Sequence, residues 1–427
     1  MKIVVRPSVV DGRIAASPSK SYTHRAFAAA LLSEGASKII NPLRAQDTEA
    51  TRRACLLLGA DVRDFGEFVE VVGGCLKTPE DVIDVGNSGT TLRLFTAISA
   101  LAPRGYAILT GDESIRRRPM KPLLEALRGL GVECWSGRLN DTAPIIVKCG
   151  GVRGGEAEIQ GNISSQFISA ILYASVKSER GVKLRVMGEP VSGPYIDATI
   201  AVLSSFGYVV KSASHKFFEV EGGQEGRSCS FKIPGDFGSA AFLMAGAHLT
   251  GGELEVRGLS MELPQADAKI IDVLRSFGSR VELGADAVTV RGAGGGGGGE
   301  YDLRESPDLL PVIAVMAAKS GEETVIRGVG HARYKESDRI RSMALELSKL
   351  GVEVEELPDG LRVRGREKLR GGCVFDSHGD HRVFMAFTVL AAATELGCTV
   401  MGAEWAEISY PGFLQDARSV GLGLEES

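Results

Sequence analysis

The sequence has few aromatic residues and no surplus of positive charge. Aromatic side chains make up 6% of the 427 residues, and 54 acidic residues outnumber 49 basic ones, which gives a net charge of -5. Proteins that bind nucleic acid usually carry a basic surplus on one face. We therefore predict no nucleic-acid partner, and any anion site must come from local clusters of arginine and lysine.

The sequence also lacks long apolar runs and metal-type cysteine pairs. No apolar run approaches the roughly 20 residues that span a bilayer, and the first residues, Met1 to Pro7, contain no apolar signal core. The seven cysteines are odd in number and show no CxxC spacing, which favours reduced thiols. We expect a cytoplasmic protein without membrane association.

What the chain does contain is a repeat. Its length exceeds what one hydrophobic core usually supports, so two domains are the first expectation. An amphipathic helix that ends in an apolar residue and a glycine recurs at intervals of about seventy residues. The glycines that mark these helix ends are Gly59, Gly131, Gly207, Gly278, Gly351 and Gly421. The sequence therefore predicts six repeats, three in each domain.

A second series of helices runs in step with the first and is almost wholly apolar. Helices that are apolar all round are buried, so we predict six buried helices and six surface helices, with strands between them. The buried helices are expected to begin near Ser21, Ser88, Ser165, Ser239, Pro307 and His381.

The ends of the chain predict how the domains are connected. The last repeat is expected to end at Ser427 without a strand after its glycine, whereas the first repeat begins with a lone strand. We infer that the N-terminal strand completes the C-terminal domain. The predicted domains are residues 1–15 together with 234–427, and an inserted domain of residues 16–233, with Pro18 and Pro234 near the crossings.

Unusual polar residues gather at the predicted starts of the buried helices. The stretch GNSGTTLRL, residues 86 to 94, leads a glycine-rich turn into such a helix, and backbone N–H groups at a helix start favour an anion. One isolated start is better explained as an ordinary N-cap. Six starts in register instead predict a cleft between the domains for a substrate with several negative charges. The polar residues are Lys20, Ser21, Arg25, Asn87, Gly89, Thr90, Arg93, Ser164, Ser165, Gln166, Asp236, Asp308, Asp380, His381 and Arg382.

Two further basic clusters are compatible with that cleft. Three arginines, residues 116 to 118, precede a helix predicted to begin at about Pro119. In RYKESDR, residues 333 to 339, Lys335 and Arg339 are four positions apart and would share a helical face. Such like charges repel unless an anion or Glu336 lies between them, and a solvated charged helix is the alternative interpretation.

Taken together, these motifs resemble one known family. The matching stretches run in order from Ser17 to Pro411, nearly the whole chain, and the family is that of 5-enolpyruvylshikimate-3-phosphate synthase. The stretches are SPSKSYTHR at 17 to 25, GNSGTTLR at 86 to 93, RRRP at 116 to 119, SSQ at 164 to 166, SGPYID at 192 to 197, PD at 307 to 308, RYKESDR at 333 to 339 and DHR at 380 to 382.

The resemblance implies a fold and a reaction. The fold is α/β, with two domains of three βαβαββ-type repeats each and buried helices, the inside-out α/β barrel of enolpyruvyl transferases. The domains would close on shikimate-3-phosphate and phosphoenolpyruvate. The enolpyruvyl group would move to the 5-hydroxyl of shikimate-3-phosphate through a tetrahedral intermediate, with release of phosphate. No metal and no organic cofactor are implied, and we expect a monomer.

The resemblance also implies roles for individual residues. The acceptor substrate would be bound by Ser21, Arg25, Ser164, Ser165, Gln166, Ser192, Tyr195 and Lys335. Phosphoenolpyruvate would be bound by Lys20, Gly89, Arg118, Gln166, Arg339 and Arg382. Asp308 would be the base for the 5-hydroxyl, and Glu336 and Lys20 would deliver protons to the methylene carbon and the departing phosphate.

The chain departs from the family pattern at a few positions. A lysine that many members carry shortly before the C-terminal aromatic-Pro pair has no counterpart, since Glu407, Ile408 and Ser409 precede Tyr410. His331 stands where an asparagine is frequent, and Leu94 where a proline is frequent. The missing lysine reduces the expected cation set around phosphoenolpyruvate, for which Lys121 or a nearby arginine could compensate.

Two other interpretations are open at this point. The sister family, which transfers the enolpyruvyl group to UDP-N-acetylglucosamine, resembles this one in its repeats. It shows Lys-Asn where Lys20-Ser21 stands here, and a loop cysteine near the position of Ser114. A non-catalytic anion-binding scaffold of six repeats is the second alternative, but such a protein has no need of Asp308 and Glu336 together.

Overall fold

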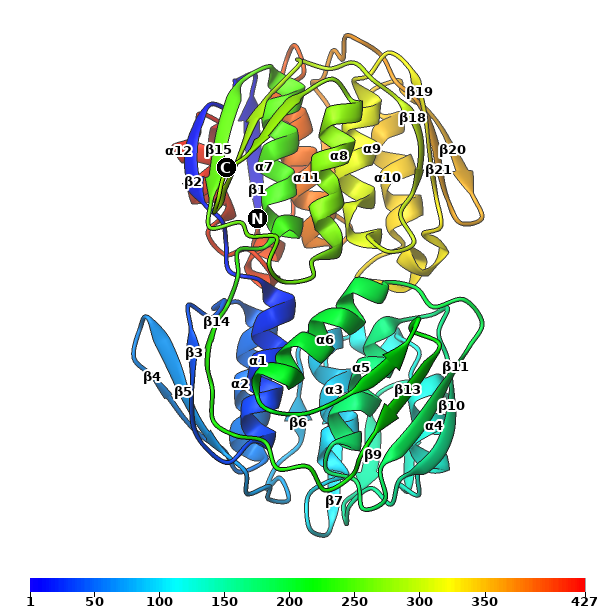
Figure 1. Cartoon of the computed structure of the whole chain (residues 1–427). Coiled ribbons are helices and arrows are strands. Elements are labelled where there is room, and N and C mark those ends of the chain that lie inside the picture. Colours follow the sequence, from blue (N-terminus) through cyan, green and yellow to red (C-terminus); the bar gives the residue numbers. More distant parts are fainter. Residues whose placement is uncertain (427) are drawn as a thin grey trace. The chain divides into compact units, whose positions relative to one another are not determined.

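The computed structural model describes residues 1–426, which form two compact units. Unit 1 consists of the N-terminal segment up to Ser17 and the chain from Pro234 onward, and unit 2 extends from Pro18 to Ile233 (Figure 1). Both changeovers lie beside a proline. The boundary predicted after residue 15 lies slightly before the first changeover, and the one predicted after residue 233 coincides with the second.

Six helices form the interior of the two units, three in each. Their sequences are rich in alanine, leucine and phenylalanine on every side, so they bury most of their surface. In α7, for example, every residue from Phe237 to Leu249 is buried. The interior helices are α1 (Lys20–Leu32), α3 (Gly89–Ser99) and α5 (Ser165–Ser175) in unit 2, and α7 (Phe237–Thr250), α9 (Leu310–Ala318) and α11 (His381–Ala392) in unit 1.

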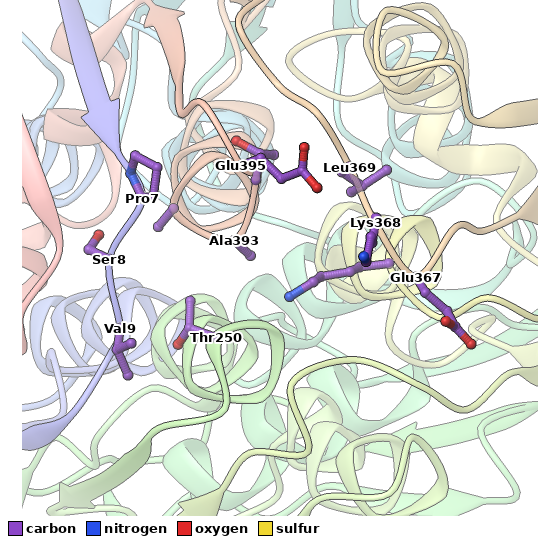
Figure 2. A pocket seen from close by; sticks show the side chains of 12 residues that line it. Pro7, Ser8, Val9, Thr250, Glu367, Lys368, Leu369, Ala393 and Glu395 are labelled. Carbon is purple, nitrogen blue, oxygen red and sulfur yellow. The ribbon is translucent and has the colours of Figure 1, made fainter.

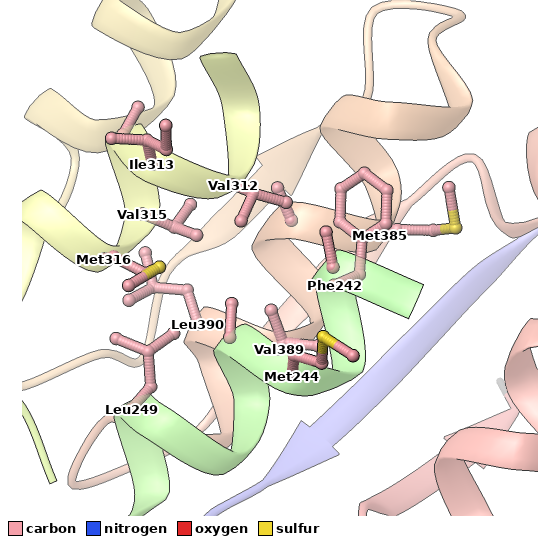
Figure 3. Packing of buried hydrophobic residues seen from close by; sticks show 14 of the residues in the cluster. Phe242, Met244, Leu249, Val312, Ile313, Val315, Met316, Met385, Val389 and Leu390 are labelled. Atoms are coloured by element: carbon pink, nitrogen blue, oxygen red, sulfur yellow. The ribbon is translucent and has the colours of Figure 1, made fainter. Parts of the chain in front are cut away.

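The core of unit 1 is the contact between its three interior helices. Phe242 and Met244 of α7 pack close to Val312 of α9 and Val389 of α11, and all four side chains are fully buried (Figure 3). Burying a side chain of this size contributes about 1.5–3 kcal/mol. The packing therefore fixes the three helices side by side and aligns their starts at one end.

Six further helices are amphipathic and cover the outside. In α4 the leucines Leu123, Leu124 and Leu127 are buried, whereas Lys121 and Glu125 are exposed. The outer helices are α2 (Gln46–Leu57), α4 (Lys121–Gly129), α6 (Gly193–Ser205), α8 (Ile270–Ser276), α10 (Arg339–Ser348) and α12 (Phe413–Ser419). Within residues 1–426 no helix combines the length and apolarity that a membrane span requires.

One of the six repeat glycines follows each outer helix, two or three positions after its last residue. All six have a positive φ, for example 87° at Gly131 and 95° at Gly421. A left-handed residue at this position terminates a helix, and glycine adopts it without steric cost. The regular glycines of the sequence therefore mark helix ends.

The strands of residues 1–426 form six sheets of four strands each. In every sheet the first two strands are parallel and the others antiparallel, so the six repeats share one topology. Unit 2 holds the sheets β14 (Ser230–Lys232), β3 (Gly35–Ile40), β5 (Phe68–Gly73), β4 (Asp61–Asp64); β6 (Ile83–Asp84), β7 (Tyr106–Thr110), β9 (Ile145–Lys148), β8 (Cys134–Ser136); and β10 (Gly155–Gln160), β11 (Val182–Met187), β13 (Phe217–Val220), β12 (Lys211–Ala213). Unit 1 holds β2 (Gly12–Ala15), β15 (Glu253–Arg257), β17 (Ala287–Arg291), β16 (Arg280–Leu283); β18 (Gly299–Asp302), β19 (Glu323–Arg327), β21 (Gly360–Arg364), β20 (Glu353–Leu357); and β22 (Val374–Asp376), β23 (Cys398–Met401), β1 (Lys2–Arg6), β24 (Gly423–Glu426).

The N-terminal strand β1 lies between the last two strands of the chain. Ile3 is paired with Val400 of β23 on one side and with Glu426 of β24 on the other. The prediction that the last repeat has no strand after its glycine is wrong, because β24 follows Gly421. The segment is short and acidic and has little intrinsic strand preference, so its pairing with β1 decides its conformation.

Candidate active site

A buried arginine gathers three carboxylates at the helix starts of unit 1. Arg339 has 1% of its side chain exposed, and its Nε lies 2.8 Å from Asp380 Oδ2. Its Nη1 lies 2.7 Å from Asp308 Oδ1, and its Nη2 lies 2.7 Å from Glu336 Oε2. Burial alone would lower the pKa of Arg339, but the nearby charges of Asp380, Glu336 and Asp308 raise it above its ordinary value. The guanidinium therefore stays charged and fixes the three carboxylates.

Asp380 connects this cluster to the interior helix α11. It is the N-cap of α11 and accepts a hydrogen bond of 2.8 Å from the backbone N–H of Arg382. Burial and, to a smaller extent, Glu336 would raise the pKa of Asp380, but Arg339 and His381 lower it overall. The sequence motif GDHR thus places an ionised carboxylate and an arginine at one helix start.

Asp308, the predicted base, is surrounded by three cations. It lies in the short 3-10 helix Pro307–Leu309 that leads into α9. Besides its contact with Arg339, its Oδ2 lies 2.9 Å from Arg382 Nη2, and its Oδ1 lies 3.6 Å from Lys335 Nζ. Its side chain keeps 17% of its surface exposed. The carboxylate is thus held in a fixed orientation and can still be reached by a small molecule.

The predicted common helical face of Lys335 and Arg339 is wrong. Lys335 follows the 3-10 helix Gly330–Tyr334, and α10 begins only at Arg339, because Asp338 acts as its N-cap and accepts from the N–H of Arg341 at 3.1 Å. Asp308 contacts both cations, so the anion expected between them is a carboxylate of the chain itself. Burial lowers the pKa of Lys335, and Asp308 opposes that shift.

His331 lies in the 3-10 helix Gly330–Tyr334 and is half-buried. Burial and, to a smaller extent, Lys335 lower its pKa to about 4. Near neutral pH it therefore adds no positive charge beside Lys335.

In unit 2, Arg25 is buried among neutral oxygens. Its Nε donates to Thr199 Oγ1 at 2.9 Å, and its two Nη atoms donate to the carbonyl oxygens of Ser21 and Tyr195 at 2.9 and 3.0 Å. Burial lowers the pKa of Arg25 from its ordinary value. These bonds connect the start of α1 to the start of α6 without neutralising the cation, so the local charge favours an anion.

Gly89, the first residue of α3, lies beneath two guanidinium groups. A Cβ at this position would lie 2.6 Å from Arg118 Nη1 and 2.9 Å from Arg93 Nη1. The φ of Gly89 is not positive, so the position requires glycine for space and not for conformation. Two cations at the positive end of a helix dipole repel each other, and a bound anion would relieve this.

Arg118 and Arg93 are oriented by hydrogen bonds to neighbouring side chains. Arg118 Nη2 donates to Asn87 Oδ1 at 3.3 Å and to Ser114 Oγ at 3.2 Å. Arg93 Nη1 donates to Gln166 Oε1 at 2.6 Å, and its guanidinium lies 5.2 Å from the ring centre of Phe167. Arg93 thus connects α3 to α5, a role that the sequence leaves open.

Gln166 is held in one amide orientation. Its Oε1 accepts from Arg93, and its Nε2 donates to Thr90 Oγ1 at 3.0 Å. Nε2 carries a second N–H, so the side chain presents a donor to any ligand at this helix start.

Serine side chains occupy the starts of α5 and α6. Ser164 is the N-cap of α5 and accepts from the N–H of Gln166 at 3.3 Å, and Ser165 is the first residue of the helix. Ser192 precedes α6 in a left-handed conformation with a φ of 57°, which is uncommon for a residue other than glycine. Hydroxyl groups and backbone N–H groups at a helix start together suit a phosphate.

Lys20 is the first residue of α1, and its Nζ lies 2.9 Å from Asp47 Oδ2. Asp47 lies in the first turn of α2 and is 4% exposed. The sequence gives no sign that Asp47 is the partner of Lys20, because 27 positions separate them and no motif connects the two. It also gives no role to Asp380, although DHR contains it.

A cavity of about 480 Å³ lies at the other end of the unit 1 helices (Figure 2). It is lined by Thr250 at the end of α7, by Lys319 just after α9 and by Ala392 at the end of α11, together with the segment Pro7 to Val9. None of the predicted site residues lines it. The helix starts, and not this cavity, therefore define the candidate active site.

Solved structures with the same fold cover the whole chain. A structure of EPSP synthase from Acinetobacter baumannii superposes with a TM-score of 0.82 at 25% identity and covers 99% of each chain. The enolpyruvyl transferase NikO from Streptomyces tendae superposes with a TM-score of 0.81 over 100% of this chain and 98% of its own, at 18% identity, which supports the fold alone. The predicted fold class, with two domains of repeated β and α units, is confirmed.

Curated relatives match over their full length. The protein named 3-phosphoshikimate 1-carboxyvinyltransferase in Korarchaeum cryptofilum is 47% identical over 99% of both chains. The protein of that name in Methanothermobacter thermautotrophicus is 45% identical over 98% of both chains. Residues 4–417 match the family described as EPSP synthase (3-phosphoshikimate 1-carboxyvinyltransferase). The chain therefore belongs to the EPSP synthase family, as its motifs predict.

Proposed function

We propose that this chain transfers the enolpyruvyl group of phosphoenolpyruvate to the 5-hydroxyl of shikimate-3-phosphate and releases phosphate. The observation that carries the proposal is the position of Asp308, a partly exposed carboxylate in contact with Lys335, Arg339 and Arg382. The names of the full-length relatives support the same activity over transfer to a UDP-sugar. An enolpyruvyl transfer needs a fixed base next to cations, and Asp308 meets both requirements.

The cations of both units supply the charge for phosphoenolpyruvate. Arg118 and the backbone of Gly89 would contact the ligand in unit 2, together with Lys20 and Gln166, and Arg339 and Arg382 in unit 1. Arginine binds carboxylate and phosphate groups through two parallel hydrogen bonds, which also fixes their orientation. Arg339 is already bonded to three carboxylates, so we assign the direct contacts in unit 1 mainly to Arg382.

The serine starts of α5 and α6 suit the phosphate of the acceptor substrate. We assign its 3-phosphate to Ser164, Ser165 and Ser192. We assign the carboxylate of the acceptor substrate to Ser21 and Arg25. The three hydrogen bonds of the Arg25 guanidinium go to neutral oxygens, so they do not neutralise its charge. Gln166 and Tyr195 would contact the ring, and Lys335 the same substrate from unit 1.

The acid and base of the reaction lie in different surroundings. Asp308 accepts the proton of the 5-hydroxyl as the hydroxyl oxygen attacks the phosphate-bearing carbon of phosphoenolpyruvate. That carbon becomes electrophilic only as the neighbouring methylene gains a proton, which we assign to Glu336 or Lys20. Lys20 Nζ lies 2.9 Å from Asp47 Oδ2, and a lysine side chain at this helix start can donate a proton. Glu336 Oε2 lies 2.7 Å from Arg339 Nη2, and it can act as the acid only when its carboxyl group carries a proton.

Phosphate release tests the proposal. The purified chain is mixed with phosphoenolpyruvate and either shikimate-3-phosphate or UDP-N-acetylglucosamine. We expect release with the shikimate acceptor alone. Phosphate release only with the UDP-sugar would show the sister activity instead. No release with either acceptor would support the alternative of a non-catalytic anion-binding protein.

The reaction also requires both sets of helix starts to act on the same substrates. We therefore propose that the units close on the bound ligands, as in other enzymes that exclude water from a reactive intermediate. Small-angle scattering with both substrates present should show a smaller radius of gyration than without them. An unchanged radius would reject closure.

A further inference from the structure

Two cysteines of unit 1 face each other across a pair of parallel strands. Cys398 begins β23, and Cys373 directly precedes β22, one position before the paired residues Val374 and Thr399. Their sulfur atoms are 3.7 Å apart. Adjacent strands lie about 4.8 Å apart, which falls within the Cα separation of about 4.4–6.8 Å found in disulfides. The backbone therefore already has the spacing that a disulfide needs.

The surroundings of the pair make it reactive. Cys398 is 4% exposed, whereas Cys373 is half-buried and directly precedes β22, the edge strand of its sheet. The hydrogen bond from the Cys373 thiol lowers the pKa of Cys398 below its ordinary value, against the opposing effect of burial. A lowered pKa increases the thiolate fraction, and the thiolate is the form that reacts with oxidants.

We propose that Cys373 and Cys398 form an intramolecular disulfide when the protein meets a hydroperoxide. The thiolate attacks one peroxide oxygen, the O–O bond breaks, and the sulfur becomes a sulfenic acid while hydroxide leaves. The second sulfur then attacks the sulfenic sulfur, the S–S bond forms, and the oxygen leaves as water with the remaining proton. With hydrogen peroxide the thiolate–thiol pair loses two electrons and one proton, and the peroxide becomes one water and one hydroxide, which takes a proton from the solvent.

The disulfide would close the last βαβ unit of the chain. Cys373 precedes β22 and Cys398 follows α11, so the cross-link joins the two ends of the segment that carries this interior helix. The start of α11, with Asp380 and Arg382, lies at the other end of the helix. The cross-link would restrict the unfolded chain and stabilise unit 1, and we expect it to leave the candidate active site unchanged.

Peroxide titration of the full chain tests this inference. We expect non-reducing peptide mass analysis to show one cross-linked pair that contains residues 373 and 398, lighter by two hydrogen atoms and restored by dithiothreitol. The oxidised protein should melt about 5–10 °C higher than the reduced protein. Phosphate release should be the same for both forms, which separates this test from that of the proposed function.

Two variants make the result specific. Cys373→Ser removes the cysteine at the sheet edge, so it should fold, lose the cross-link and lose the peroxide-induced rise in melting temperature. Cys75→Ser changes an exposed cysteine and should keep both. Peroxide that converts Cys398 to sulfinic acid without a cross-link, or that leaves both thiols intact, would overturn the inference. An equal melting shift in Cys373→Ser would overturn it as well.

Discussion

The two units share one repeat topology, but their interior helices begin with different chemistry. In unit 1, carboxylates lie at all three starts, Asp236, Asp308 and Asp380, and two of them contact Arg339. In unit 2 the N-caps of α3 and α5 are serines, and Arg25 donates only to neutral oxygens. The starts of the interior helices thus carry balanced charge in unit 1 and surplus positive charge in unit 2.

This difference shows how two units with one fold can have different roles in a reaction, one fixing a base and the other binding anions. A cluster in which cations and carboxylates balance can fix a base and keep it ionised. A helix start with hydroxyl groups and uncompensated cations attracts and orients anions. The comparison predicts that a change at the base of unit 1 reduces turnover, whereas a change at the anion-binding arginines of unit 2 weakens substrate binding.

The largest effect is expected at Asp308 of unit 1. Asp308→Asn keeps the size of the side chain but removes the base, so turnover should fall by about 10²–10⁴-fold. Asp308→Ala should lower turnover similarly, with little change in binding measured by calorimetry. Asp302→Asn, at an exposed carboxylate of the same unit, serves as the control. A near-normal rate for Asp308→Asn would remove Asp308 as the base and break the comparison.

A change at Arg25 of unit 2 should affect binding instead. Arg25→Lys keeps the charge but cannot make all three hydrogen bonds of the guanidinium. We expect the dissociation constant for shikimate-3-phosphate to rise about 10–100-fold, since a hydrogen bond to a charged group contributes about 1.5–3 kcal/mol. Arg13→Lys on the exposed β2 is the control. A fall in turnover with unchanged affinity would contradict the assigned role.

A smaller effect is expected at Gly89. In Gly89→Ala the new Cβ would displace the guanidinium groups of Arg118 and Arg93. The KM for phosphoenolpyruvate should rise by about 10-fold, the equivalent of roughly 1.4 kcal/mol, with a smaller change for the acceptor. Gly129→Ala, whose Cβ would lie at an ordinary 3.8 Å from Ala157, is the matched control. Equal KM values for wild type and Gly89→Ala would show that the arginines can move aside.

The smallest effect concerns acid stability, in which the two units should behave alike. Burial lowers the pKa of His248 in unit 1 to about 4 and that of His24 in unit 2 well below 6.5. Both folded-state values are depressed, so the unfolded chain binds more protons below pH 6.5 and stability falls as the pH drops from there toward 4.

Urea unfolding near neutral pH and at about pH 5 measures this effect. We expect the wild type to lose about 1–3 kcal/mol over that interval for each buried histidine. His248→Gln, which can still bond to Ser279 Oγ, should lose less. If His248→Gln loses as much unfolding free energy as the wild type, groups other than His248 cause the acid sensitivity.

The sequence predicts the repeats well because each depends on local signals. Glycine after an outer helix and an apolar stretch after a polar turn are both visible within about ten residues. Most residues named from the motifs lie at helix starts in the structure. Lys335 differs, since Asp338 and not the charge spacing determines where α10 begins. The partners of these residues are harder to predict, because contacts such as Lys20 to Asp47 depend on how separate helices pack.

The place of β1 between β23 and β24 has a consequence for synthesis on the ribosome. Unit 2 is complete once Ile233 has been made, whereas β1, although made first, must wait for the last residues of the chain. Domains generally fold as units while the chain emerges, so we expect the inserted unit to fold before the unit that contains the N-terminus. Limited proteolysis of ribosome-bound chains of increasing length would reveal the order, and early protection of residues 1–17 would contradict it.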